Sequence, residues 1–109
     1  MGYPQEYYPD VKWAISRALL GEINPSLRGV CFEWDKTNDE ILVYFYHDGI
    51  LSDNIKDHYE SIGCEASADF IFDNRLIKSD FIVVSLPYPQ QLPHAHFWVY
   101  ARREPFVDP

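Results

Sequence analysis

Ile41-Leu42-Val43-Tyr44-Phe45-Tyr46-His47 is the stretch that decides how the rest of the chain is interpreted. Successive residues of a strand point to opposite faces, and here both alternating sets are apolar or aromatic. Such a strand suits the inside of a sheet that is covered above and below. We therefore expect residues 41–47 to form a central strand, and we place the other elements around it.

Length and charge limit the classes of protein to consider. The 109 residues fit one domain, 1–109, which can bury a core without metal or disulfide bonds. The 17 acidic and 9 basic residues give a net charge of -8, which disfavours nonspecific binding to nucleic acid or an anionic membrane. A basic protein partner is favoured instead. Because the sequence shows neither a secretory signal pattern nor a membrane-length apolar run, we expect a cytoplasmic location.

A helix is expected before the first strand. Pro9 and Asp10 are typical of a helix start, because proline fits a first turn and aspartate accepts hydrogen bonds from the free amides there. Gly21 is typical of a helix end. The apolar stripe between these signals consists of Val11, Ala14, Ile15, Ala18 and Leu19.

Three further segments lie before the second helix. Residues 1–8 contain three tyrosines, and we expect an extended lead-in whose rings dock on the body. Residues 28–34 alternate with period two, which predicts a strand. The polar run 35–40 is rich in turn formers and is expected to close a hairpin onto residues 41–47.

The second half predicts one helix and two strands. Ser52 or Asp53 caps a helix that ends at residues 73–74. Gly63 lies within it, either at a bend or where another element comes close. Its apolar positions are Ile55, Tyr59, Ile62, Ala66 and Phe70. Residues 76–86 and 95–103 are expected to be strands, joined by the proline-rich loop 87–93 that crosses the end of the sheet.

The order α-β-β-α-β-β predicts an α+β fold, with a mostly antiparallel four-stranded sheet and both helices on one face. Alternation assigns six side chains to the helix side: Phe32, Val43, Phe45, Val84, Phe97 and Val99. It assigns six to the opposite side: Glu33, Tyr44, Tyr46, Trp98, Tyr100 and Arg102. An exposed aromatic surface with charged neighbours is typical of a binding site. The alternative is that the proline-rich loop or the N-terminal tyrosines cover this surface.

Catalytic and metal chemistry find little support in the sequence. His94 and His96 share a strand face and His47 ends another strand, but no cysteine or carboxylate is placed to complete a zinc site, and we expect solvated histidines. Cys31 and Cys64 lack any motif spacing and are expected to be free, buried thiols. No nucleophile motif or phosphate-binding glycine loop occurs. We therefore expect neither an enzyme nor a bound metal or cofactor.

Acidic residues gather in two clusters. One surrounds the first hairpin and contains Glu33, Asp35, Asp39 and Glu40. The other includes the start of the second helix and contains Asp48, Asp53, Asp57 and Glu60. A solvated surface is the ordinary interpretation. The sharper hypothesis is an anionic patch that meets the basic active-site cleft of a nuclease, where electrostatic steering speeds association.

Blocks of sequence across nearly the whole chain carry a family resemblance. They are residues 18–28 (ALLGEINPSLR), 44–49 (YFYHDG), 68–70 (ADF), 87–93 (PYPQQLP) and 98–103 (WVYARR). The chain resembles small bacterial immunity proteins of polymorphic toxin systems, in particular those of contact-dependent growth inhibition. The resemblance implies a cytosolic protein that neutralises the C-terminal toxin domain of a sibling effector, often a nuclease. It assigns no binding residue.

The leading hypothesis is therefore a non-enzymatic immunity protein that binds a toxin domain with a basic surface. Surface arguments alone supply its candidate partner-binding residues, which are Glu33, Asp35, Asp39, Glu40, Tyr44, Tyr46, Asp48, Asp53, Asp57, Glu60, Trp98 and Tyr100. One alternative is a small intracellular enzyme or ligand-binding domain with a pocket under the loop from Pro87 to Pro93. A homodimer that pairs aromatic sheet faces is compatible with the leading hypothesis.

Overall fold

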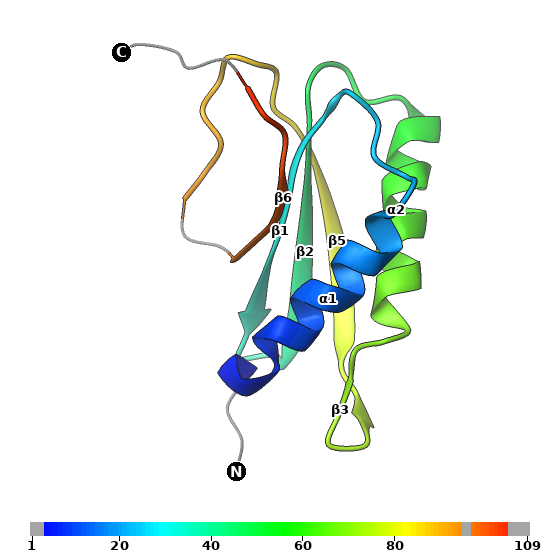
Figure 1. The fold of residues 1–109 in the computed structure, drawn as a ribbon, viewed down its shortest axis with the longest axis vertical. Coiled ribbons are helices and arrows are strands. Elements are labelled where there is room, and N and C mark those ends of the chain that lie inside the picture. Colours follow the sequence, from blue (N-terminus) through cyan, green and yellow to red (C-terminus); the bar gives the residue numbers. More distant parts are fainter. Residues whose placement is uncertain (1–3, 95–96, 105–109) are drawn as a thin grey trace.

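A computed structural model of the chain describes residues 4–94 and 97–104. Two helices and a four-stranded sheet make up the body, and a short two-stranded hairpin is attached to it (Figure 1). The elements in chain order are η1 (Pro4–Tyr7), α1 (Tyr8–Leu19), β1 (Leu27–Asp35), β2 (Glu40–His47), α2 (Asp53–Ser67), β3 (Ile71–Phe72), β4 (Arg75–Leu76), β5 (Lys78–Ser85) and β6 (Phe97–Ala101).

The sheet has the strand order β5-β2-β1-β6, so β2 is an inner strand, as its double-sided apolar pattern predicts. β1 pairs antiparallel with both β2 and β6, whereas β2 and β5 run parallel. A parallel pair needs a long crossover, and α2 supplies it. Both helices lie on one face of the sheet (Figure 1). The α+β class and mostly antiparallel sheet are confirmed, and the parallel pair and the β3–β4 hairpin are differences in detail.

The N-terminal segment departs from the expected extended lead-in. Residues 4–7 form a 3-10 helix that runs directly into α1, which begins at Tyr8. The predicted docking of tyrosines is confirmed for Tyr7, whose ring stacks 4.8 Å from that of Phe72. Tyr8 meets Phe32 edge-on at 5.5 Å. The apolar stripe of α1 is buried as predicted, and Gly21 has the left-handed φ of 77° just after the helix.

The second helix is shorter than the sequence pattern suggests. Ser52 caps it by accepting a hydrogen bond from the Ile55 amide at 3.2 Å, but it ends at Ser67. The predicted end at residues 73–74 is wrong, because Asp73 and Asn74 have positive φ and turn the β3–β4 hairpin. Gly63 marks a close approach, since a Cβ there would lie 2.5 Å from the Phe81 ring.

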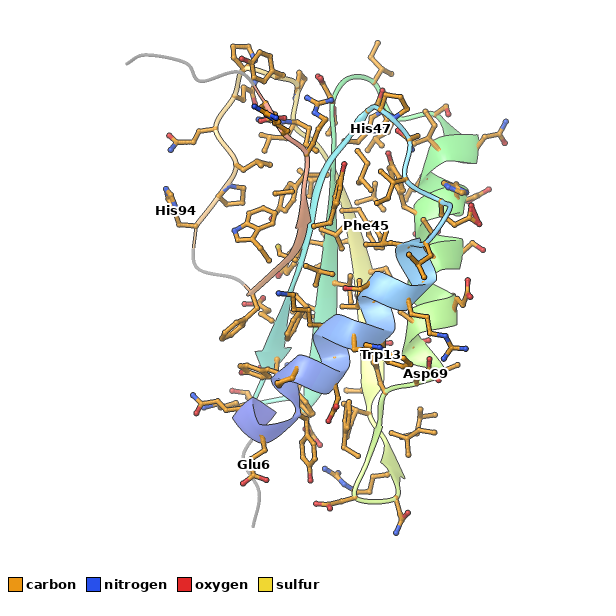
Figure 2. All side chains as sticks on the ribbon, viewed as in Figure 1. Glu6, Trp13, Phe45, His47, Asp69 and His94 are labelled. Carbon is orange, nitrogen blue, oxygen red and sulfur yellow. The ribbon has the colours of Figure 1, made fainter. Side chains whose placement is uncertain are left out.

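The hydrophobic core lies between the helices and the sheet. It joins the α1 stripe to the inward side chains of β1 and β2 and to α2. The largest fully buried apolar and aromatic side chains are Val11, Ile15, Leu27, Val30, Phe32, Ile41, Val43, Phe45, Tyr59 and Phe70. The labelled Phe45 lies on β2 (Figure 2).

The predicted facing of β5 is wrong. Phe81 pairs with Val43 and packs against the core, so Val84 lies beside Tyr46 on the opposite side. The predicted strand 76–86 is in fact the end of the β3–β4 hairpin followed by β5. Because β5 is apolar on both sides, alternation alone could not decide which side faces the helices.

The facing of the last strand changes along its length. Residues 97–101 form β6, and residues 95–96 of the predicted strand lie outside the described residues. Trp98 pairs with Cys31, but a bulge at Val99 makes Tyr100 the partner of Val30. Tyr100 therefore packs against the core on the helix side, and its predicted outward position is wrong. A bulge inserts one extra residue and so reverses the facing of those beyond it.

Candidate functional site

We call the face of the sheet that lies away from the helices the outer face. Residues paired across neighbouring strands share a face, so the register places every member. Near the β1–β2 hairpin the outer face carries carboxylates, and farther along it carries apolar and aromatic groups. Its members are Gly29, Cys31, Glu33, Asp35, Glu40, Leu42, Tyr44, Tyr46, Lys78, Asp80, Ile82, Val84, Trp98 and Ala101.

Three aromatic rings occupy the centre of the outer face. Tyr44 and Tyr46 stack nearly parallel, with centroids 6.3 Å apart and an interplanar angle of 8°. Trp98 lies 5.9 Å from Tyr46. Its ring rests on Gly29, where a Cβ would come within 2.7 Å of the indole. Tyr46 is buried by these neighbours, whereas Tyr44 and Trp98 are partly exposed and present fixed aromatic surface.

The polar groups of this centre are the phenols of Tyr44 and Tyr46 and the thiol of Cys31, which are uncharged, and they lie beside the carboxylate of Glu33. Tyr44 donates a hydrogen bond to Glu33 at 2.5 Å. Burial, followed by this hydrogen bond, raises the pKa of Tyr44 far above its usual value. Burial also raises the pKa of the Cys31 thiol to about 12 and that of Tyr46 to about 12. The outer face therefore holds no thiolate near neutral pH and suits binding better than nucleophilic chemistry.

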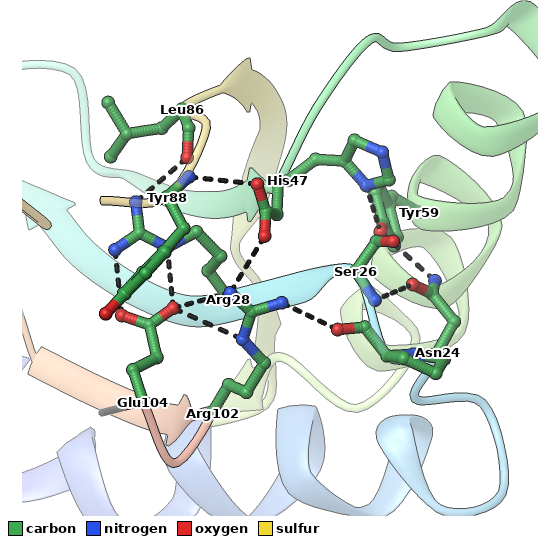
Figure 3. A network of polar contacts seen from close by, with 11 residues as sticks. Asn24, Ser26, Arg28, His47, Tyr59, Leu86, Tyr88, Arg102 and Glu104 are labelled. Carbon is green, nitrogen blue, oxygen red and sulfur yellow. Dashed lines mark hydrogen bonds and ion pairs between the residues drawn. The ribbon is translucent and has the colours of Figure 1, made fainter. Parts of the chain in front are cut away.

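A buried ion-pair network lies at the end of the sheet far from the β1–β2 hairpin (Figure 3). Arg28 is only 2% exposed, and its guanidinium donates to both carboxylate oxygens of Glu104, at 2.7 and 2.8 Å. It also donates to the Leu86 carbonyl at 2.9 Å and lies over the Tyr88 ring. These contacts tie β1 to the start of the β5–β6 loop and to the residues after β6.

Arg102 extends the network to the loops around it. Its guanidinium donates to Glu104 at 2.8 Å, to Asp48 at 3.0 Å and to the Pro25 carbonyl at 2.7 Å. Asp48 also accepts the Tyr88 amide at 2.9 Å. These bonds fix the loop as it crosses the end of the sheet, the path predicted from its prolines (Figure 1). Asp48 is thereby engaged within the protein, so it contributes little to an anionic surface.

His47 and Tyr59 form a second buried polar contact at this end. Tyr59 lies 2.7 Å from His47 Nδ1 and accepts a hydrogen bond from the Asn24 amide at 3.1 Å (Figure 3). In the tautomer that leaves Nδ1 unprotonated, the Tyr59 hydroxyl donates to His47. Burial lowers the pKa of His47, which is 3% exposed, and favours the neutral ring. The expectation of a solvated histidine at this position is wrong, although His94 is exposed (Figure 2).

The sequence of the chain matches a family model described as MafI2 immunity protein over residues 9–104. The chain belongs to the MafI2 immunity protein family. Family membership implies a toxin-neutralising function, in agreement with the resemblance seen in the sequence, and favours a binding role over catalysis. Among curated proteins, no sequence matches the chain.

The structure of this MafI2 family member divides the candidate residues among different surfaces. The outer face brings together Glu33, Asp35, Glu40, Tyr44, Tyr46 and Trp98. Asp39 instead accepts from the Trp34 indole at 3.0 Å and from Arg75 at 3.2 Å. Asp53, Asp57 and Glu60 lie on α2, which covers the opposite face of the sheet. The two acidic clusters therefore do not form one patch.

Sequence reasoning missed several residues that belong to this surface or support it. Asp80 and Ile82 share the outer face because of the register of β5 with β2, which the sequence pattern did not show, and Leu42 shares it by alternation with Tyr44. Arg28 and Glu104 pair across 76 positions, and no local signal connects them. Cys64 is exposed, so its predicted burial is also wrong, while Cys31 is buried and free as expected.

Among the described residues, two hollows border α1, and neither of these lies under the loop from Pro87 to Pro93. One, of about 360 Å³, adjoins the outer face at its β6 edge and is lined by Tyr8, Pro9, Lys12, Phe32, Phe97 and Trp98. The other, of about 430 Å³, lies on α1 itself. Within residues 4–94 and 97–104, no group of three His, Cys, Asp or Glu side chains is arranged to hold a metal ion. Among the helices of the described part, none has the length and apolar character to span a membrane.

Proposed function

We propose that the chain neutralises a cognate nuclease toxin domain in the bacterial cytosol, in a contact-dependent growth inhibition system, by binding it through the outer face. The observation that supports this most strongly is the placement of aromatic anchors beside a carboxylate cluster on one surface. Tyr44 and Trp98 are partly exposed, and Glu33 lies within hydrogen-bond distance of Tyr44. Aromatic side chains of this kind dominate the binding energy of many protein interfaces.

The charge of the outer face indicates the chemistry of the partner. Glu33, Asp35, Glu40 and Asp80 lie toward its hairpin end, where Lys78 also shares the face. A nuclease must attract the phosphates of its substrate, so the surface around its active site is basic. An acidic protein surface complements that region and hinders the approach of nucleic acid. The whole-chain charge of -8 acts in the same direction.

The acidic side of α2 has a different role in this proposal. Asp53 and Asp57 are exposed on the helix side of the molecule and do not adjoin the aromatic centre. Charges outside the contact area still speed the encounter with a basic partner, because steering acts over roughly a Debye length of ~10 Å or more. We assign α2 to attraction and the outer face to tight binding.

The experiment is a binding measurement between the purified chain and the toxin domain encoded beside it. Tyr44→Ala is expected to weaken binding by about 30-fold or more, corresponding to ~2 kcal/mol for an interface anchor. Ile50→Ala is the matched control, because Ile50 is 91% exposed and lies off the outer face, in the loop before α2. Unchanged affinity for both Tyr44→Ala and Trp98→Ala, with folding intact, would refute the outer face as the binding site.

A further inference from the structure

We propose that the free edge of β5 binds an extended, basic segment of the toxin domain, which adds a strand to the sheet. The inference rests on the proposed function and names the part of the partner that is recognised. In strand addition, main-chain hydrogen bonds give affinity and alternate side chains give specificity. β5 is an outermost strand of the four-stranded sheet, and within the described residues no strand pairs with its other side (Figure 1).

Two hydrogen bonds show which way the backbone groups of β5 point. Just after β5, the Leu86 amide donates to the His47 carbonyl of β2 at 2.8 Å. Alternate residues of a strand direct their amides to the same side, so the even-numbered residues of β5 face β2. The Phe81 amide instead donates to the side chain of Asp80 at 2.9 Å. The backbone groups that point to the free edge are therefore those of Ser79, Phe81, Val83 and Ser85.

The edge formed by β5 lacks most of the features that keep edge strands from pairing. β5 has eight residues in continuous register with β2, and it contains neither a bulge nor a proline. Lys78 and Asp80 place charges near its start only, and the apolar residues 81–84 are all partly exposed. The opposite edge is different, because β6 has five residues and a bulge at Val99. Since short, bulged and charged edges resist pairing, β5 is the edge open to an added strand.

An added strand would continue the outer face. Ile82 and Val84 of β5 lie on that face, where they pair with Tyr44 and Tyr46 of β2. Side chains on one face of neighbouring strands contact each other, so alternate side chains of the added strand would pack on Ile82 and Val84. The toxin domain would thus cover the aromatic centre and pair with β5 in the same complex.

On its helix side the same edge is bordered by α2. Gly63 lies against the Phe81 ring, and Glu60, three residues before Gly63, is on the same side of the helix. His58 points the other way, and its Nε2 lies 3.2 Å from the Glu22 carbonyl just after α1. Glu60 is therefore on the side of α2 away from α1, which is the side of the free edge of β5 (Figure 1).

The charges around this edge favour a basic segment. The charged residues on this side of α2 and on β5 are Asp53, Asp57, Glu60 and Asp80, together with Lys56 and Lys78. Acidic groups therefore border the edge from both the helix side and the outer face, and the lysines balance them only in part. A second copy of the chain paired at this edge would bring the same carboxylates together, so charge favours the toxin domain over a homodimer.

Amide hydrogen exchange, followed by NMR, reads the alternation directly. In the chain alone, β2 should protect the amides of Ile82 and Val84, whereas the Val83 amide should exchange freely. Binding of the toxin domain encoded beside the chain should slow exchange at Ser79 and Val83 by about tenfold or more. Unchanged exchange at both residues, in a complex that still depends on Tyr44, would overturn strand addition and leave the proposed function standing.

Two other outcomes of the exchange measurement also count against the inference. A chain that forms no complex with the toxin domain would overturn the proposed function and strand addition together. Protection of Val83 in the chain alone, lost on dilution, would identify a second copy as the occupant of the edge and would overturn the assignment to the toxin.

Proline variants test whether the edge contributes affinity. Ser79→Pro and Ser85→Pro each remove an amide that points away from β2 and place a ring in the path of an added strand. At least one of them should weaken toxin binding by about tenfold or more, while the matched controls Ser79→Ala and Ser85→Ala, which keep the amide, should bind like the wild type. Circular dichroism checks that each variant is folded.

The comparison with alanine decides the role of the edge. Binding that neither proline variant weakens more than its alanine control would overturn the proposal. The exchange measurement uses the wild-type chain, so it decides the question where a proline variant fails to fold.

Discussion

Replacing Glu104 with glutamine should destabilise the fold by an amount that the geometry of its ion pair sets. Glu104 accepts two hydrogen bonds from Arg28, whose side chain is 2% exposed, and Arg102 donates to the same carboxylate. The variant keeps an amide oxygen but removes the charge, so a buried guanidinium loses its counter-ion and lies beside a second cation. Breaking a buried pair in this way costs about 3 kcal/mol. For a chain of 109 residues we expect the melting temperature to fall by roughly 12 °C.

The matched control is Asp69→Asn. The Arg17–Asp69 pair joins the same chemical groups at 3.3 Å, but both side chains are about half exposed, so its loss should cost under ~1 kcal/mol. Urea unfolding at pH 7 measures both variants. A loss for Glu104→Gln no larger than that for Asp69→Asn would show that the buried network contributes nothing beyond a surface pair.

The pH dependence of this difference tests its electrostatic origin. The hydrogen bond from Arg28 lowers the pKa of Glu104 below the usual value of 4.5. A carboxyl with a depressed folded-state pKa stabilises the fold above its unfolded pKa, and this contribution is lost as pH falls through the folded value. The stability gap between the wild type and Glu104→Gln should therefore be constant above about pH 5 and narrow below about pH 4. A gap that stays constant across this range would mean that packing, and not charge, causes the loss.

Three further outcomes follow from the structure. The double variant Asp53→Lys, Asp57→Lys should lower the association rate with the toxin domain by about tenfold at low salt and leave the dissociation rate nearly unchanged. Stopped-flow binding at two salt concentrations measures both rates. An unchanged association rate would make α2 a solvated surface only. Gly29→Ala should lower the free energy of unfolding by ~1 to 3 kcal/mol, because the added methyl group would lie 2.7 Å from the Trp98 indole. This loss should largely vanish in a Trp98→Ala background. A loss that persists there would assign the strain to the backbone. Burial lowers the pKa of His47, so the free energy of unfolding should be at its full value above the unfolded pKa of ~6.5 and should decline as pH falls toward the folded value. The free energy of unfolding of His47→Gln should decline less over the same range. Equal pH profiles for the two proteins would exclude this histidine as the cause.

Local periodicity was enough to predict most of the fold. The α1 stripe and the two-sided pattern of residues 41–47 each identify an element because burial on one side or on both leaves a distinct spacing of apolar residues. The hairpin between β1 and β2 was equally visible, since a polar run of turn formers separates two strand patterns. These signals place the helices against one face of an inner strand, and family resemblance adds the function.

The errors arose where distant contacts override local pattern. Val84 lies on the outer face because the pairing of β5 with β2 decides the facing of a strand that is apolar on both sides. Tyr100 turns inward because of the bulge at Val99, which leaves no sign in alternation. His47 is buried because Tyr59 on α2 satisfies its ring nitrogen, and Asn24 in the α1–β1 loop in turn donates to the Tyr59 hydroxyl. Each outcome depends on a partner that the local sequence does not specify.

The carboxylates at the two ends of the sheet differ in how they are engaged, and this difference orients the proposed partner. Asp48 and Glu104 lie at the end near the β5–β6 loop, where Arg28 and Arg102 neutralise them. At the hairpin end, Glu33, Asp35, Glu40 and Asp80 share the face with Lys78, so the negative potential is concentrated there. A basic partner would therefore place its cationic groups over the hairpin and its apolar groups over Trp98. Charge reversal at Glu40 should accordingly weaken binding to the toxin domain. Charge reversal at Asp48 should weaken binding less in a variant that folds, because the charge of Asp48 is already balanced by Arg102 within the protein.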